Sequence, residues 1–222
     1  MDQFNIFISV GGTASAKQEA FVRAVEDRLR SEGLVPHTVG RNTFSADAPL
    51  ETITELMDSC IGTVVIALER TYYPSGFDKP GGPNQAALSD VRLPTPWNQI
   101  EAAMAFSRGH PMMVIMEKGL KSEGLLERGH KWYVQWVAVD AASLSTVEFN
   151  GVFGSWKSKV MIQHASQKNE AEKSKPKVNP TDLTVGDLLR GLKPAQLWSI
   201  LAALAAMVAG AFVLGAKLLG TP

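Results

Sequence analysis

Apolar positions along the chain follow two spacings, which together predict a succession of strands and helices. Short runs rich in Val, Ile and Phe are typical of strands buried in a parallel sheet. Segments in which apolar residues recur every three or four positions, such as Phe21, Val25 and Leu29, are typical of helices that bury one face. The strands are predicted at 4–10, 34–39, 63–68, 112–116 and 136–139, and the helices at 18–32, 49–59, 95–109 and 153–168.

This alternation of strand and helix predicts an α/β fold, namely a flavodoxin-like five-stranded parallel sheet with helices on both faces. In such sheets ligands bind at the carboxyl ends of the strands, where the strand order reverses. The segment 70–94 is rich in Gly and Pro and is predicted to be a long loop.

The C-terminal part has a different character, because no charged residue occurs from Pro194 to Ala216. A helix of this length spans about 35 Å, against about 30 Å for a bilayer core. We therefore expect a transmembrane helix, with a buried core helix as the alternative. The predicted organisation is an α/β domain at 1–165, a linker at 166–181, a short amphipathic helix at 182–193 and the transmembrane helix at 194–219.

Composition and flanking charges add the expected location and partners. Lysines and arginines lie mainly upstream of the apolar run, so the positive-inside rule predicts a single-pass membrane protein with a cytoplasmic N-terminal domain. A single cysteine, Cys60, also fits a reducing compartment. Small residues four apart in the apolar run favour a homo-oligomer. Lys+Arg and Asp+Glu are balanced at 22 each, which argues against nucleic-acid binding.

The candidate chemistry rests on one carboxylate. The sequence has no Walker A loop, no G-x-G-x-x-G and no metal-ligand spacing among its histidines, so neither a cofactor nor a metal is expected. Glu101 comes early in the helix after the third strand, close to the expected ligand site, where the helix dipole favours negative charge. From position alone, a solvated helix residue is the alternative.

Two short motifs resemble the TIR domain, with a wider similarity to nucleoside deoxyribosyltransferase-like proteins. The first strand contains Phe7-Ile8-Ser9, and Trp97-Asn98-Gln99-Ile100-Glu101 resembles the TIR pattern Trp-Cys-x-x-Glu with Asn98 in place of the cysteine. The resemblance covers residues 4 to 160 and implies that Glu101 is catalytic. It departs from the family in lacking an acidic residue in the first loop and in the length of segment 70–94.

Four further residues are candidates for substrate binding. Ser9 and Gly11 lie where ribose or phosphate would approach the backbone, and Trp97 is placed to stack on a base, with an ordinary turn and a buried ring as the respective alternatives. Phe44 follows the second strand, where TIR domains carry a segment that mediates assembly.

Three functions follow from these observations. The first, which the TIR resemblance implies, is a membrane-anchored NAD nucleosidase, a glycohydrolase or a synthase of a cyclic ADP-ribose signal, acting in bacterial antiphage defence with NAD as substrate. The second is a non-catalytic TIR-like interaction module. The third is a nucleoside deoxyribosyltransferase-like N-glycosidase, whose leaving base needs a second acid, for which Asp78 and Asp90 are candidates.

Overall fold

Five parallel strands form one sheet in the computed structural model of this chain, in the order β2-β1-β3-β6-β7. The strands β1 (Phe4–Val10) and β3 (Gly62–Ala67) pair in the middle of the sheet. Outside them lie β2 (Leu34–His37) on one side and β6 (Met112–Glu117) and β7 (Tyr133–Val137) on the other. The predicted five-stranded parallel α/β sheet is therefore confirmed.

The structure describes residues 4–174, and the chain divides into two units, 1–170 and 171–222. Among the helices of the described residues, none is both long and apolar enough to cross a membrane. The predicted amphipathic helix at 182–193 and the predicted membrane span at 194–219 lie outside the described residues. The first part of the predicted linker is helical, up to Ser174.

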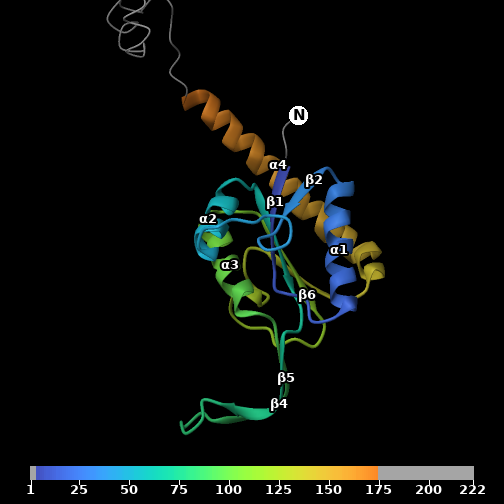
Figure 1. Ribbon diagram of the computed structural model, residues 1–222, viewed down its shortest axis with the longest axis vertical. Coiled ribbons are helices and arrows are strands. Elements are labelled where there is room, and N and C mark those ends of the chain that lie inside the picture. Colours follow the sequence, from blue (N-terminus) through green and yellow to red (C-terminus); the bar gives the residue numbers. More distant parts are fainter. Residues whose placement is uncertain (1–3, 175–222) are drawn as a thin grey trace, which may run out of the picture. The chain divides into compact units, whose positions relative to one another are not determined.

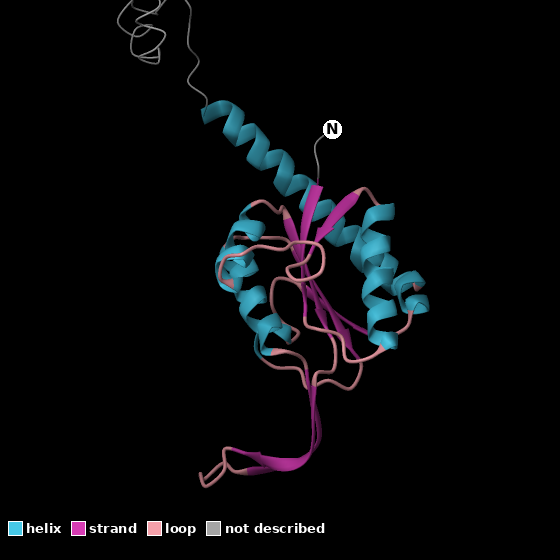
Figure 2. Ribbon diagram, viewed as in Figure 1, coloured by secondary structure: helices cyan, strands magenta, loops and turns pink. Residues whose placement is uncertain are grey.

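Helices cover both faces of the sheet (Figures 1 and 2). One face is covered by α1 (Ala16–Ser31) and α4 (Val147–Ser174), and the other by α2 (Pro49–Asp58) and α3 (Pro96–Ser107). Two short 3₁₀ helices flank β7, η1 (Gly124–Leu126) and η2 (Ala141–Ser145). Because the crossovers from β1 and β3 run over opposite faces, the chain leaves the carboxyl ends of these two strands in opposite directions.

The two-residue period of the strands divides the core into two layers. In β1, Ile6 and Ile8 pack under α1 and α4, whereas Phe7 packs under α2 and α3. All six residues of β3 are buried, as expected for a central strand covered on both faces. The continuous apolar runs of the sequence are therefore explained by burial on both sides.

Local sequence fixes where the helices begin. The Ser15 hydroxyl accepts a hydrogen bond from the Gln18 N–H at 3.2 Å and caps α1. Thr95 caps α3 by accepting from the Trp97 N–H at 3.4 Å, and Pro96 occupies the first turn, where its missing N–H leaves no donor unsatisfied.

The prediction of a loop at 70–94 was wrong, because the segment forms an antiparallel hairpin of β4 (Thr71–Asp78) and β5 (Ala86–Leu93). No residue of either strand is buried, so the sequence lacks the apolar run by which the other strands were recognised. Pro74 also interrupts β4, and proline within a run argues against a strand. The hairpin extends beyond the carboxyl ends of the sheet (Figure 1).

Cross-strand register gives the hairpin one charged face and one uncharged face. Tyr72 lies opposite Arg92, with the Arg92 guanidinium 5.6 Å from the Tyr72 ring centre, and the Tyr72 hydroxyl hydrogen-bonds Asp90 at 2.7 Å. On the other face Tyr73 pairs with Val91 and Phe77 with Ala87. The hairpin is therefore held mainly by its own cross-strand contacts.

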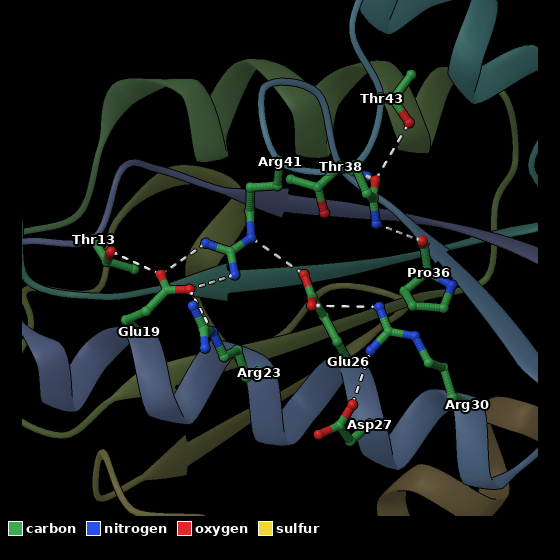
Figure 3. A network of polar contacts seen from close by, with 11 residues as sticks. Thr13, Glu19, Arg23, Glu26, Asp27, Arg30, Pro36, Thr38, Arg41 and Thr43 are labelled. Carbon is green, nitrogen blue, oxygen red and sulfur yellow. Dashed lines mark hydrogen bonds and ion pairs between the residues drawn. The ribbon is translucent and has the colours of Figure 1, made fainter.

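An ion-pair network ties the loop after β2 to α1 (Figure 3). Arg41 donates to both carboxylate oxygens of Glu19, at 2.9 and 3.0 Å, and to Glu26 at 3.2 Å. Glu26 is only 7% exposed and is also paired with Arg30 at 3.5 Å. Hydrogen bonds from Arg41 and then Arg23 lower the pKa of Glu19 to about 2. Arg41 thus fixes the loop that carries Phe44.

We expect Arg41→Met to lower the free energy of unfolding at pH 7 by about 1–2 kcal/mol, because Glu26 stays buried with a weaker partner. Arg23→Met is the matched control, since Arg23 is 70% exposed, and should cost less than about 0.5 kcal/mol. Urea unfolding followed by tryptophan fluorescence measures both. The lowered pKa of Glu19 stabilises the fold above pH 4.5 and is lost as pH falls towards 2, so the effect of Arg41→Met should shrink over that window. Equal effects of the two substitutions would contradict the assigned role of Arg41.

Replacing residues 73–91 by a short Gly-rich turn should leave the sheet intact, because the excised residues contribute nothing to either core layer. The expected change in Tm is less than about 4 °C, corresponding to about 1 kcal/mol. Circular dichroism on heating measures it, and loss of the cooperative transition would show that the hairpin is part of the folding unit.

Candidate functional site

The crevice between the carboxyl ends of β1 and β3 is the point where the strand order reverses, and ligands bind at such points in open α/β sheets. Ser9 in β1 and Ile66 in β3 lie here, since Ser9 pairs with Val65 and Val10 with Ile66. The first turns of α3 lie over this crevice and bring Asn98 and Glu101 to it.

Asn98 anchors α3 to both strands. Its Nδ2 atom lies 3.2 Å from the Ser9 carbonyl oxygen, 2.9 Å from the Ser9 Oγ and 3.5 Å from the Ile66 carbonyl oxygen. Its side chain is 1% exposed. One amide therefore connects the helix with the ends of both central strands.

Glu101 lies one turn further along α3 and is 8% exposed. Burial raises the pKa of this carboxyl from 4.5 to about 7, and a hydrogen bond with the Ser9 side chain acts in the opposite direction. Because Ser9 Oγ accepts from Asn98, its hydroxyl hydrogen is available to donate to Glu101. Asn98 and Ser9 thus orient the carboxyl group.

Two buried acceptors at this point have no protein partner. Glu101 Oε2 and Asn98 Oδ1 are both inaccessible and make no hydrogen bond with any residue of 4–174. Buried polar atoms are normally satisfied by protein, water or ligand. When Glu101 is ionised, both oxygens accept, so the missing partner is then a donor such as a hydroxyl group or a water molecule.

A small cavity, which we call the switch-point cavity, adjoins Asn98, whereas Glu101 and Ser9 are not among its lining residues. Gly11, Glu69, Arg70, Thr95 and Asn98 are among its lining residues. Its volume of about 10 Å³ holds about one water molecule. Arg70 Nη1 donates to the Gly12 carbonyl oxygen at 3.1 Å across the rim, so a larger ligand has to separate these two groups.

Close packing and one glutamine hold the walls of the switch-point cavity. A Cβ atom added to Gly11 would lie 2.8 Å from Thr95 Cγ2, so the first loop can approach the start of α3 only with glycine there. The Gln18 side chain accepts from the Ala14 N–H at 2.7 Å and donates to the Glu69 carbonyl oxygen at 2.9 Å. It thereby joins the loop after β1 to the segment after β3.

The structure places the five predicted site residues unevenly. Ser9 and Glu101 are hydrogen-bonded to each other but are not among the lining residues of the switch-point cavity, whereas Gly11 is. Trp97 is 42% exposed and is not among the lining residues. Phe44 is 77% exposed in the loop between β2 and α2, also outside the lining.

The candidate second acids belong to the hairpin rather than to the cavity. Asp90 in β5 accepts a hydrogen bond from the Tyr72 hydroxyl, and Asp78 is the last residue of β4. Both aspartates are exposed. The carboxylate that lines the switch-point cavity is instead Glu69, paired with Arg92 at 3.5 Å. Sequence reasoning missed Glu69 and Arg70, although their position directly after the third predicted strand places them at the carboxyl edge of the sheet.

Within residues 4–174, no group of three or more His, Cys, Asp and Glu side chains is arranged to hold a metal ion.

No protein-family model matches this chain, and no curated protein matches it. Among solved structures, the chain is similar to the CMP N-glycosidase BcmB of Clostridium botulinum, with 14% sequence identity and a TM-score of 0.37. The similarity covers 63% of this chain and 92% of BcmB.

We expect Glu101→Gln to stabilise the protein at pH 8 by about 1–3 kcal/mol, because ionising this buried carboxyl costs free energy in the folded state. The pKa is raised, so the wild type loses stability as pH rises from 4.5 to about 7, and the two proteins should converge near pH 4.5. Urea unfolding at pH 4.5 and 8 measures the difference. The exposed Glu51→Gln on α2 is the control and should show no such pH dependence. A Glu101→Gln protein that is less stable than the wild type at pH 8 would show that the ionised carboxylate is well solvated.

Proposed function

We propose that this chain cleaves an N-glycosidic bond between a ribose and a base, with Glu101 acting at the anomeric carbon. The observation that carries the proposal is the buried Glu101 carboxyl, oriented by Ser9 and with Oε2 unpartnered, at the carboxyl ends of the central strands. Breaking such a bond develops positive charge on the sugar, which a carboxylate stabilises or traps covalently.

The unpartnered acceptors suit a ribose. Asn98 Oδ1 and Glu101 Oε2 both need donors, and sugar hydroxyl groups supply them. With a pKa of about 7, a sizeable fraction of Glu101 is ionised at neutral pH, and a positively charged substrate would increase that fraction. Binding requires the rim contact between Arg70 and Gly12 to open.

NAD is the first substrate proposed, as the TIR resemblance implies. Its nicotinamide is already cationic and leaves as a neutral molecule, so one carboxylate is sufficient. A nucleoside or nucleotide is the second substrate class. Its base leaves more readily when it is protonated, and this protonation requires a second acid. Glu69 favours this second class, since it supplies a carboxylate to the lining of the switch-point cavity, next to Asn98.

The proposed membrane attachment, location and oligomeric state are based on the sequence. We propose a single-pass membrane protein with a cytoplasmic N-terminal domain, which forms homo-oligomers through the α/β domain and the apolar run at 194–219. A role in bacterial antiphage defence is the biological context that the TIR resemblance suggests.

A non-catalytic interaction module is the second candidate function. It is supported by the size of the switch-point cavity, which holds about one water molecule. Phe44, in the loop fixed by Arg41, and Leu50, in α2, are 77% and 51% exposed and supply apolar surface.

The test is cleavage of NAD and of nucleoside monophosphates by the full chain in detergent, with nicotinamide and free bases separated by chromatography. Glu101→Gln should lower the rate at least about 100-fold, and Glu51→Gln should not. The rate should rise with pH through about 7, since the ionised carboxylate is the reactive form. Glu69→Gln should impair nucleotide cleavage more than NAD cleavage. Absence of turnover at every concentration by a folded wild type would reject the enzyme and favour the interaction module.

A further inference from the structure

A second cavity lies at the opposite end of the sheet, where β6 and β7 begin. We call it the α4 cavity, because one wall consists of α4 residues and the other of Met112, Trp132 and Tyr133. Met112 and Tyr133 are the first residues of their strands, so this cavity lies at the amino ends, away from Glu101. Its volume of about 290 Å³ is close to the lower limit for small-molecule sites.

The wall on α4 is open because of its small residues. Gly151, Ser155 and Lys159 follow one another at intervals of four and therefore share one face of the helix. A Cβ atom added to Gly151 would meet no other atom within 4 Å. The absence of a side chain at Gly151 therefore leaves room beside the helix.

The aromatic residues of the cavity are already fixed in place. Trp156 Nε1 donates to the Pro111 carbonyl oxygen at 3.0 Å, and Trp132 Nε1 to the Leu125 carbonyl oxygen at 3.0 Å. The Tyr133 hydroxyl is bonded to Glu148 at 3.2 Å. Tyr133 is 44% exposed and offers the surface of its ring, whereas Trp156 is only 4% exposed and Trp132 is already stacked on His130, with 4.6 Å between the ring centres. Because the polar atoms of all three are occupied, what remains accessible is apolar, and little ordering is needed on binding.

The available polar groups of the lining are one ammonium and one hydroxyl group. Neither Lys159 nor Ser155 makes a side-chain hydrogen bond or ion pair with the part of the chain that the structure describes. Lys157, two residues earlier, shows the contrast, since its Nζ binds Glu32 Oε2 at 2.8 Å. An unpaired ammonium group beside rigid aromatic surfaces is complementary to an aromatic anion.

We propose that the α4 cavity binds a planar aromatic carboxylate of one or two rings. The ring lies chiefly against the exposed Tyr133 ring, with the accessible parts of Trp132 and Trp156 at its edges, and the carboxylate is bound by the Lys159 ammonium and the Ser155 hydroxyl. This site is separate from the switch-point cavity and does not depend on the function proposed for Glu101.

The first test fills the cavity. The full chain in detergent is titrated with 2-naphthoate by isothermal titration calorimetry, with the same detergent without protein as the blank. Gly151→Leu should weaken binding at least about tenfold, because its side chain enters the open space. Gly154→Leu is the matched control, since Gly154 lies on the same helix with equally open surroundings but outside the lining, and it should bind like the wild type.

The second test removes the charge. Lys159→Met should weaken binding of 2-naphthoate about tenfold while leaving binding of the neutral 2-naphthamide nearly unchanged. Lys17→Met, on α1 and outside the lining, is the control. The proposal is overturned if the wild type does not bind 2-naphthoate at about millimolar concentration, if Gly151→Leu binds as well as Gly154→Leu, or if the amide binds as tightly as the carboxylate.

Discussion

The side chain of Asn98 is the contact on which the arrangement at the carboxyl end of the sheet depends. Its amide reaches the Ser9 backbone and hydroxyl in β1 and the Ile66 carbonyl in β3, and so fixes the start of α3 over both strands. An unpaired amide at 1% exposure would cost free energy, so these contacts also stabilise the helix in this position. The burial of Glu101 follows from this, because it lies one turn further on the same side of α3.

Burial gives Glu101 its chemical character. The same carboxyl on an exposed helix face would be fully ionised at neutral pH, whereas here burial raises its pKa to about 7 and the Ser9 hydrogen bond lowers it only in part. Holding a partly ionised carboxyl in the fold costs stability, and perturbed groups of this kind are found more often at functional sites than elsewhere. The orphan oxygens of Asn98 and Glu101 are consistent with a site that is completed by a donor.

The two ends of the sheet differ in how they are closed. At the carboxyl end, the base of the hairpin supplies Glu69, Arg70 and Thr95 to a cavity that holds about one water molecule. At the amino end, Gly151 leaves a larger cavity open between α4 and the edge of the sheet. The two cavities thus differ in size and in lining, since the smaller is bordered mainly by loops and the start of α3, and the larger by α4 and aromatic side chains.

The sequence alone determined the five strands, their parallel arrangement and the approximate position of the helices, because burial on both faces leaves continuous apolar runs such as 63–68. It also placed Ser9 and Glu101 at the same edge of the sheet, because Ser9 lies near the end of the first strand and Glu101 lies early in the helix that follows the third strand. It could not reveal the hairpin, whose exposed strands stabilise each other by cross-strand contacts and carry no apolar run. Only the tertiary structure decided that Glu101 is buried, that Trp97 and Phe44 lie outside the cavity, and that Glu69 lines it. The physical reason is that periodicity records which face of an element is covered, whereas the partners of a polar side chain depend on residues that are distant in the sequence.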